Sequence, residues 1–406
     1  PQLNRMKNRF IKDMMKKIIT ILVFTFFISF TLFNLHAEDI QCIWTDVEKI
    51  IAIGDLHGDY ESFLNILQQT RIIDKEHHWI AGKVHLVQIG DIFDRGSQPK
   101  EILNLLMKLE KEAEEAGGKV HVLIGNHEMI NIAGRAFDFT GYVSLGQFVS
   151  FLPGKYKEEI ETKFRKSLGE NSPTETSSNS SFDPNLEVEW RKFLKDATSS
   201  RNHPARRKYF QNLIEKYGEW IINKNAVIKI NDIIFVHGGL NEKYSKRKLK
   251  DLNKAIQKEM KSLAAATKSS FSRNVQSRIV YDSNGPLWYR ELAHGEEKYF
   301  LDEVDRILKN LKARYMVIAH TPKLIDNKDD MKRFNGKIWI IDTGISTVYR
   351  NGRQSALIVE NGEFKPWLGV PRKRKPTSSE DTIQFQEGIC INNIALYSFL
   401  NALPRQ

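Results

Sequence analysis

Six short runs of apolar, often β-branched residues recur along the chain, and each is followed directly by glycine, aspartate or histidine. Runs of this length and composition are typical of buried strands. They occupy residues 50–53, 84–89, 120–124, 233–236, 315–319 and 337–341. Between the second and third runs, residues 99–116 carry leucine and isoleucine at helical spacing and end at Gly117-Gly118. Strands alternating with a helix predict an α/β fold, in which ligands bind at the carboxyl ends of the strands.

Potential ligand side chains follow five of these runs in short motifs. The motifs are Gly54-Asp55-Leu56-His57-Gly58-Asp59, Gly90-Asp91-Ile92-Phe93-Asp94-Arg95-Gly96, Gly125-Asn126-His127-Glu128, Val236-His237-Gly238-Gly239 and Ala319-His320-Thr321-Pro322. A single histidine at a strand end is more often a structural group than a ligand, so the interpretation depends on the joint pattern. The glycines beside these donors let the backbone come close to a bound group.

The pattern indicates a site for two metal ions. Because side chains alternate along an extended segment, Asp55 and His57 face the same side and can bind one metal ion. The Asp91 carboxylate can bridge two ions. The second site would be completed by Asn126, His237 and His320. A mixture of nitrogen and oxygen ligands suits Zn, Fe or Mn, and two such ions favour hydrolysis of phosphate esters.

These motifs resemble those of the phosphoprotein-phosphatase (PPP) family of calcineurin-like metallophosphoesterases. Asp91 lies 36 residues after Asp55, and Asn126 lies 35 residues after Asp91, which are spacings that fit the family. The resemblance covers residues 48–370 and implies a β-sandwich flanked by helices. Within the family, four segments are most similar to bacterial-type Shewanella-like protein phosphatases. These segments are residues 125–131, 235–240, 285–290 and 342–344.

The resemblance also implies a role for each matching residue. Asp55, His57 and Asp91 would hold one metal ion, and Asp91, Asn126, His237 and His320 the other, as a divalent or mixed-valence pair. His127 would protonate the leaving oxygen while Asp94 orients it, and metal-bound hydroxide would attack directly. Arg95 would grip the phosphate through its planar guanidinium, with Asn126 beside it. Arg290 is the candidate for a second phosphate-binding arginine; the alternative is an exposed arginine that follows a core Trp288.

The expected activity is hydrolysis of phosphate monoesters on phosphorylated proteins or peptides, at phosphotyrosine or at phosphoserine and phosphothreonine. Pro322, after His320 and Thr321, favours the PPP type over phosphodiesterases that have Gly-His-x-His at this motif. Two alternatives are a diadenosine tetraphosphatase or small-molecule phosphatase on the same scaffold, and a non-catalytic binding protein. The second is disfavoured because all six ligand positions are present. Aromatic residues in 151–217 and 285–290 favour phosphotyrosine, because they could flank its ring.

The first 37 residues predict a leader and signal peptide. A basic start at residues 14–17 precedes the apolar run 18–33 and a small residue, Ala37, which is the order of an export signal. The protein is therefore expected in the periplasm or secreted; the alternative is an uncleaved membrane anchor at 18–33. The net charge is +11, but outside these residues it falls to +6, from 55 basic and 49 acidic groups. This modest excess disfavours a nucleic-acid partner.

The remaining chain divides into a main domain, residues 38–370, and a C-terminal tail, residues 371–406. Residues 151–217 interrupt the domain with an insertion, in which the polar loop 171–183 lies between helical stretches at 156–168 and 187–197. This insertion forms either a lid over the site or a passive surface excursion. Residues 243–277 predict a Lys-rich helix on the outside of the core. In an oxidising compartment Cys42 and Cys390 could form a bridge; the alternative is two free thiols.

Overall fold

The computed structural model describes residues 14–20, 40–138, 141–168, 189–190, 192–193, 204–269, 278–349 and 351–372. The chain divides into two compact units, residues 1–41 and residues 42–406. In the first unit, residues 14–20 are helical. Within the described part of the chain, no helix has both the length and the apolar character needed to cross a membrane. The loop 171–183 and the tail after Arg372, with Cys390, lie outside the described residues, whereas Cys42 is buried with a free thiol.

The first sheet of the second unit is built on three parallel strands. Its order is β11-β10-β2-β3-β4, with β2, β3 and β4 parallel and β10 antiparallel to both β2 and β11. The strands are β2 (Lys49–Ile53), β3 (His85–Gln88), β4 (Lys119–Val122), β10 (Ser355–Glu360) and β11 (Glu363–Leu368). The first three runs of the sequence pattern are therefore confirmed as neighbouring strands, and their carboxyl ends lie at one edge.

The second sheet repeats this arrangement. Its order is β1-β5-β6-β7-β9-β8, and β6, β7 and β9 are parallel to one another. The strands are β1 (Ile43–Trp44), β5 (Val227–Ile230), β6 (Ile233–Val236), β7 (Tyr315–Ile318), β8 (Lys332–Arg333) and β9 (Ile338–Ile340). The last three runs of the pattern form these three parallel strands, so the second set of polar motifs also meets at one edge.

The two sheets pack face to face as a sandwich. The Phe364 ring of β11 lies 4.9 Å from the Trp339 ring of β9 and 4.7 Å from the Tyr315 ring of β7. At the carboxyl ends the backbones meet: a Cβ added to Gly54 would lie 2.4 Å from the carbonyl oxygen of Ile341. Only glycine permits that approach, which joins the two edges that carry the polar motifs.

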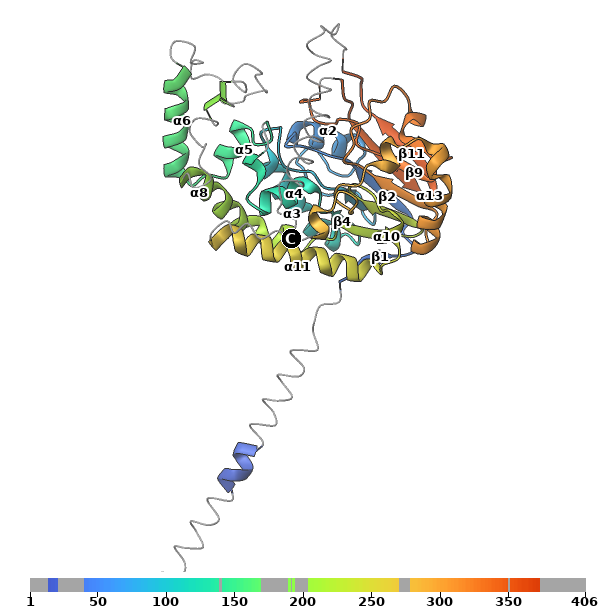
Figure 1. The fold of residues 1–406 in the computed structure, drawn as a ribbon, viewed down its shortest axis with the longest axis horizontal. Helices are drawn as coiled ribbons and strands as arrows, with labels where there is room; N and C mark the ends of the chain where they lie inside the picture. Colours follow the sequence, from blue (N-terminus) through green and yellow to red (C-terminus); the bar gives the residue numbers. More distant parts are fainter. Residues whose placement is uncertain are drawn as a thin grey trace, which may run out of the picture. The chain divides into compact units, whose positions relative to one another are not determined.

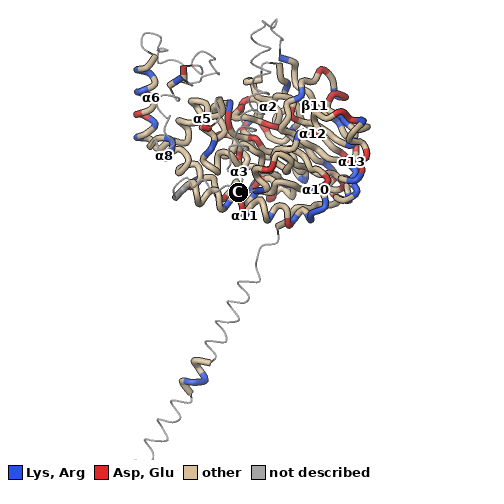
Figure 2. The backbone as a smooth tube through the Cα atoms, in the orientation of Figure 1, with Lys and Arg blue, Asp and Glu red and all other residues tan. Residues whose placement is uncertain are grey.

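Helices cover the outer sides of both sheets (Figure 1). The predicted helix at 99–116 is confirmed as α3 (Pro99–Glu115), which packs beside β4. The predicted Lys-rich helix is confirmed as α11 (Leu249–Ser269), which contacts β5. Lys254, Lys258 and Lys261 are exposed on α11, at spacings that place them on one face. Figure 2 marks the Lys and Arg positions along the described backbone in blue. The other helices of the sandwich are α2 (Tyr60–Gln69), α4 (Asn126–Ile132), α9 (Glu219–Ile222), α10 (Glu242–Ser245), α12 (Glu291–His294) and α13 (Glu297–Leu311).

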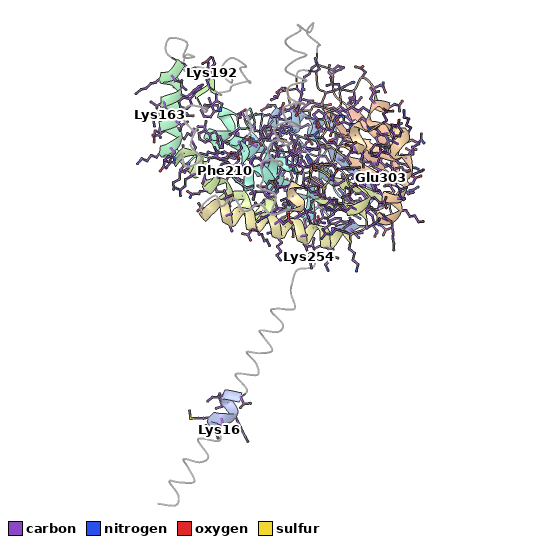
Figure 3. All side chains as sticks on the ribbon, viewed as in Figure 1. Lys16, Lys163, Lys192, Phe210, Lys254 and Glu303 are labelled. Carbon is purple, nitrogen blue, oxygen red and sulfur yellow. The ribbon has the colours of Figure 1, made fainter. Side chains whose placement is uncertain are left out.

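The described part of the insertion is helical and has an aromatic core. It follows α5 (Leu145–Ser150) and contains α6 (Gly154–Leu168) and α8 (Pro204–Leu213). The Trp190 ring packs against Phe148 at 5.6 Å and Phe164 at 5.5 Å. Figure 3 labels Phe210 of α8, which is buried, and Lys163 of α6, which is exposed. Through Phe148 and Phe210 this aromatic cluster is continuous with the main hydrophobic core.

Candidate active site

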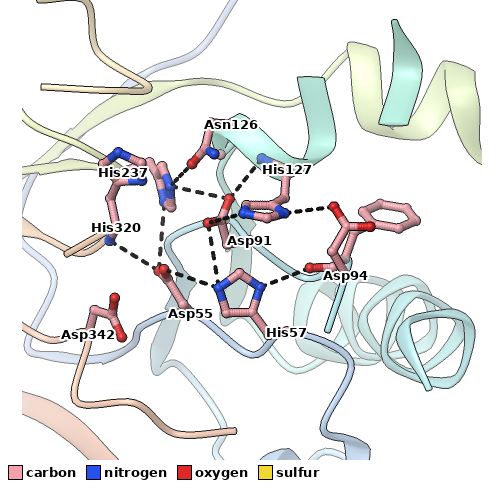
Figure 4. Close-up of polar contacts among 12 residues, drawn as sticks. Asp55, His57, Asp91, Asp94, Asn126, His127, His237, His320 and Asp342 are labelled. Carbon is pink, nitrogen blue, oxygen red and sulfur yellow. Dashed lines mark hydrogen bonds and ion pairs between the residues drawn. The ribbon is translucent and has the colours of Figure 1, made fainter. Parts of the chain in front are cut away.

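The six predicted metal ligands, together with Asp94 and His127, lie at the joined carboxyl edges of the two sheets (Figure 4). Asp55 and His57 follow β2, Asp91, Asp94 and Arg95 follow β3, and Asn126 and His127 open α4 after β4. From the second sheet, His237 follows β6 and His320 follows β7. The structure brings the six predicted metal ligands together. Pairwise polar contacts link five of them, Asp55, His57, Asp91, His237 and Asn126, and the His320 ring lies 4.9 Å from the His237 ring.

Asp91 lies at the centre of this cluster, with its two carboxylate oxygens facing different imidazoles. Asp91 Oδ2 lies 3.8 Å from Nε2 of His57 and 3.8 Å from Nε2 of His127, whereas Oδ1 lies 3.2 Å from Nε2 of His237. This arrangement gives two groups of residues that could each hold a metal ion, His57-Asp91-His127 and Asp91-His237-His320. Asp91 is the residue that both groups share, which is the position a bridging ligand requires.

Two predicted ligands complete the cluster from its sides. The Asp55 carboxylate lies 3.8 Å from His57 Nε2 and 3.8 Å from His237 Nδ1, and it accepts the backbone N–H of His320 at 3.2 Å. The side-chain oxygen of Asn126 lies 2.9 Å from His237 Nε2. Asp55 therefore contacts both halves of the cluster, and Asn126 lies with the His237 half.

Hydrogen bonds to backbone carbonyls orient two of the imidazoles. His57 Nδ1 bonds the carbonyl of Phe93 at 2.9 Å, and His237 Nδ1 bonds the carbonyl of Ile89 at 2.8 Å. An Nδ1–H that donates to a carbonyl leaves Nε2 with its lone pair directed into the site, as in metal-binding histidines.

Three buried atoms at the site have no hydrogen-bond partner among the described residues. They are Nε2 of His320, Oδ2 of Asp342 and the hydroxyl of Tyr349. Buried polar atoms are nearly always satisfied, because an unpaired one costs about 1–3 kcal/mol. His320 is one of the predicted ligands, and a metal ion bound by its Nε2 would remove that cost. The residues present therefore fit a metal centre, on chemistry as well as on spacing.

The electrostatics of the site also favour cations. Burial, together with the Asp342 and Asp91 carboxylates, raises the pKa of Asp55 well above its usual value. Burial and the Arg95 charge hold the pKa of His57 well below its usual range, and burial with the Arg290 charge does the same for His320. These two imidazoles are thus neutral, which is the form that binds metals. Burial opposes ionisation of Asp91, but the His237 and His127 imidazoles nevertheless hold its pKa well below the usual range.

The backbone of the site is strained. Five non-glycine residues here have φ in the left-handed region: His57 (42°), Asp91 (56°), Asp94 (71°), Arg95 (72°) and His320 (66°). Such conformations cost of order 1–3 kcal/mol each and persist only where the surroundings hold them. The buried Glu128 carboxylate helps, because it accepts the backbone N–H groups of Asp91 and Ile92, both at 2.8 Å. Glu128 was part of a predicted motif, but its structural role was not predicted.

The predicted hydrogen bond between His127 and Asp94 is present. His127 Nδ1 lies 2.6 Å from Oδ2 of Asp94, and both side chains are buried. Nε2 of His127 therefore faces the cluster, next to Asp91. The structure also groups His127 with two predicted ligands, which the sequence motifs did not indicate.

Two arginines border the cluster. The Arg95 guanidinium lies 5.7 Å from the ring of Tyr142 and 5.2 Å from the ring of Tyr349, neither of which sequence reasoning identified. Arg290 is half-buried, and its Nη1 donates to the carbonyl of His320 at 2.8 Å and to Oγ1 of Thr321 at 3.0 Å. Arg290 thus lies against a predicted ligand loop, rather than being an exposed arginine after Trp288.

Several residues that contact the site could not be identified from the sequence motifs. Tyr142, Gln147, Tyr209 and Tyr349 lie outside every motif, and nothing in their local sequence marks them. Asn131 and Asp342 belong to segments that resemble the Shewanella-like phosphatases, and that resemblance was a usable signal for both.

Comparisons with known proteins identify relatives among the phosphoesterases. The family model described as calcineurin-like phosphoesterase matches residues 48–324. Shewanella-like protein phosphatase 1 of Plasmodium berghei (strain Anka) is 29% identical over 80% of this chain and 76% of its own length. Shewanella-like protein phosphatase 2 of Arabidopsis thaliana is 43% identical over 24% of this chain and 25% of its own. The crystal structure of a cold-active protein-tyrosine phosphatase from a psychrophilic Shewanella species superposes with a TM-score of 0.53, at 25% identity, covering 82% of this chain and 83% of that one. The chain belongs to the calcineurin-like phosphoesterase family.

Proposed function

We propose that this chain is a metal-dependent phosphomonoester hydrolase that removes phosphate from phosphorylated proteins or peptides. The observation that carries the proposal is the position of Asp91, whose two carboxylate oxygens face two separate groups of buried histidines. Membership of the phosphoesterase family and the protein phosphatases among the relatives support it.

In this proposal Asp55, His57 and Asp91 hold one metal ion, and Asp91, Asn126, His237 and His320 hold the second. Mn, Fe or Zn suits this mixture of carboxylate, amide and imidazole ligands. When bound, two such ions polarise the phosphoryl oxygens and lower the pKa of water towards neutrality.

The chain's own side chains position the phosphate and supply a proton. Arg95 has a planar guanidinium that can bind two phosphate oxygens at once, and the rings of Tyr142 and Tyr349 flank it. Arg290 contributes a second positive charge from the His320 side. His127, held at Nδ1 by Asp94, donates its proton from Nε2 to the leaving oxygen.

We propose phosphotyrosine as the preferred substrate. A phenyl phosphate needs aromatic or apolar surface beside the phosphate-binding group. Trp288 of the 285–290 loop donates from Nε1 to the carbonyl of Val280, so its ring serves mainly the core. Tyr142 is buried to a similar extent as Trp288, but its ring and that of Tyr349 flank Arg95, which makes these two the rings best placed to contact the substrate.

The test combines metal analysis with substrate choice. Purified protein should contain metal and should hydrolyse a phosphotyrosyl peptide with a higher kcat/KM than a matched phosphothreonyl peptide. Diadenosine tetraphosphate serves as the third substrate. Deleting residues 171–183 tests whether that loop contributes, because the preference should weaken if the loop walls the pocket. A strong preference for phosphothreonine would overturn the phosphotyrosine proposal, and hydrolysis of the dinucleotide alone would overturn the protein phosphatase.

We further propose that residues 14–37 direct export to the periplasm or the exterior. The support is the order of charged, apolar and small residues in the sequence. N-terminal sequencing of protein recovered from cells should then give Glu38 as the first residue. An intact chain in the cytosol would contradict export, and an intact chain in the membrane fraction would show that residues 18–33 act as an anchor instead.

A further inference from the structure

A buried hydrogen-bond network connects the insertion to the proposed acid pair. The contacts that the structure gives the Asp94 carboxylate come from His127, Asn131 and Gln147. Asn131 and Gln147 both bond to the hydroxyl of Tyr209, which belongs to α8 of the insertion. All of these side chains are buried, and Asp94, Asn131, Gln147 and Tyr209 are fully so.

Gln147 holds Asp94 at two points. Its Oε1 accepts the backbone N–H of Asp94 at 2.6 Å, and its Nε2 donates to Oδ1 of Asp94 at 2.8 Å. The amide can make both bonds in only one orientation, because a carboxylate accepts and an N–H donates. Gln147 therefore fixes both the carboxylate and the strained backbone of Asp94, whose φ is 71°.

The remaining hydrogen bonds follow from this orientation. Asn131 Nδ2 donates to Asp94 at 3.0 and 3.1 Å and to the carbonyl of His127 at 3.0 Å, so its Oδ1 must accept. The Tyr209 hydroxyl donates to that Oδ1 at 2.9 Å and accepts from Gln147 Nε2 at 2.7 Å. One hydroxyl thus satisfies both amides that hold Asp94.

Packing of the insertion against the preceding part of the domain holds this hydroxyl in place. The Tyr209 ring lies 5.4 Å from Phe137, 5.5 Å from Phe148 and 5.7 Å from Phe151. A ring enclosed in this way has little freedom to rotate or tilt. The position of α8 therefore sets the position of the hydroxyl, and through the two amides it sets the direction in which Asp94 Oδ2 faces His127.

We propose that Tyr209, Asn131 and Gln147 are positioning residues for the His127–Asp94 pair, and that the insertion acts on catalysis through Tyr209. This inference rests on the proposed function, because it assigns the network to the residue that protonates the leaving oxygen. This role differs from both expectations for the insertion, a lid or a passive surface excursion, because α8 orients the general acid through buried hydrogen bonds.

Tyr209→Phe tests the proposal, because it removes the hydroxyl and keeps the ring. The matched control is Tyr217→Phe, a second tyrosine at the end of the insertion, whose hydroxyl donates to Asn104 Oδ1 at 2.9 Å and whose ring also contacts Phe151. Each variant deletes one tyrosine–asparagine hydrogen bond, and Tyr209→Phe also deletes the bond from Gln147 Nε2. Only Tyr209 is connected to Asp94. Both should contain the same amount of metal as the unaltered protein.

The readout is the dependence of turnover on the leaving group. For phenyl phosphate, kcat of Tyr209→Phe should fall about tenfold, which is part of the roughly 10²–10⁴-fold that a general acid contributes. For dinitrophenyl phosphate, whose oxygen leaves without a proton, kcat should change by less than about twofold, and KM should stay the same on both. Tyr217→Phe should leave both rates unchanged.

An NMR measurement gives a readout independent of turnover. In protein labelled with ¹⁵N-histidine, the Nδ1–H signal of His127, identified by its loss in His127→Asn, should shift in Tyr209→Phe and not in Tyr217→Phe. Gln147→Met provides a second variant, which removes both contacts to Asp94 and should reproduce the effect if Tyr209→Phe does not fold.

If the unaltered protein hydrolyses neither aryl phosphate, the proposed function fails, and this inference fails with it. A second outcome is that the unaltered protein is active, but Tyr209→Phe or Gln147→Met behaves like Tyr217→Phe both in its dependence on the leaving group and in the His127 signal. That outcome would overturn the positioning role alone.

Discussion

Asp91→Asn should remove bound metal and reduce phosphatase activity by about 10³-fold or more. The reason is that this carboxylate would hold both metal ions, and bound metal ions contribute several kcal/mol of transition-state stabilisation. Asparagine keeps the shape of the side chain but replaces one of the two anionic oxygens that face His57 and His237. The fold should persist, since asparagine tolerates the left-handed φ of 56° found at this position. Metal analysis, circular dichroism and turnover of a phosphopeptide measure the three effects.

The matched control for this substitution is Asp59→Asn. Asp59 is a buried aspartate of the first motif, and it accepts the backbone N–H groups of Ser62 at 2.9 Å and Thr347 at 2.7 Å without contacting the metal groups. Oδ1 accepts from Ser62 and Oδ2 from Thr347, so asparagine can keep only one of these two bonds. The substitution leaves every residue of the two metal groups unchanged, and the control should therefore keep its metal. Near-normal metal content and turnover in Asp91→Asn would contradict the bridging assignment.

His127→Asn should lower turnover by roughly 10²–10⁴-fold on substrates with poor leaving groups, which is the usual scale for loss of a general acid. The loss should be much smaller on activated aryl phosphates. The reason is that Asp94 binds Nδ1 of His127 at 2.6 Å, so the imidazole directs Nε2 and its proton towards the cluster. A series of aryl phosphates of graded leaving-group pKa measures the difference.

The same variant separates two roles for His127. Its Nε2 lies 3.8 Å from Asp91 Oδ2, within a group of residues that could hold a metal ion. Equal losses on good and poor leaving groups, accompanied by loss of metal, would show that His127 is a ligand rather than an acid. Retained metal with unequal losses would confirm the acid.

Much of the sandwich could be predicted from local pattern. The six apolar runs correspond to β2, β3, β4, β6, β7 and β9 with boundaries that differ by at most two residues, because a strand buried on both faces needs continuous apolar sequence. The hairpin of β10 and β11 was not predicted. Residues 363–368 mix charged, aromatic and proline residues, and the hairpin is defined by pairing with β2, some 300 residues earlier in the chain.

By itself, the sequence determined which side chains stand at the ends of the parallel strands, because strand length, alternation and the glycines that follow are local properties of the chain. Only the tertiary structure decided that Asp91 turns its two oxygens to histidines from different sheets, since this depends on the close approach at Gly54. It also decided what holds Asp94. Gln147 and Tyr209 lie 53 and 115 residues further along the chain and belong to no motif. Their contacts exist because α8 packs its aromatic face against the core, and packing between distant segments leaves no local pattern from which it could be predicted.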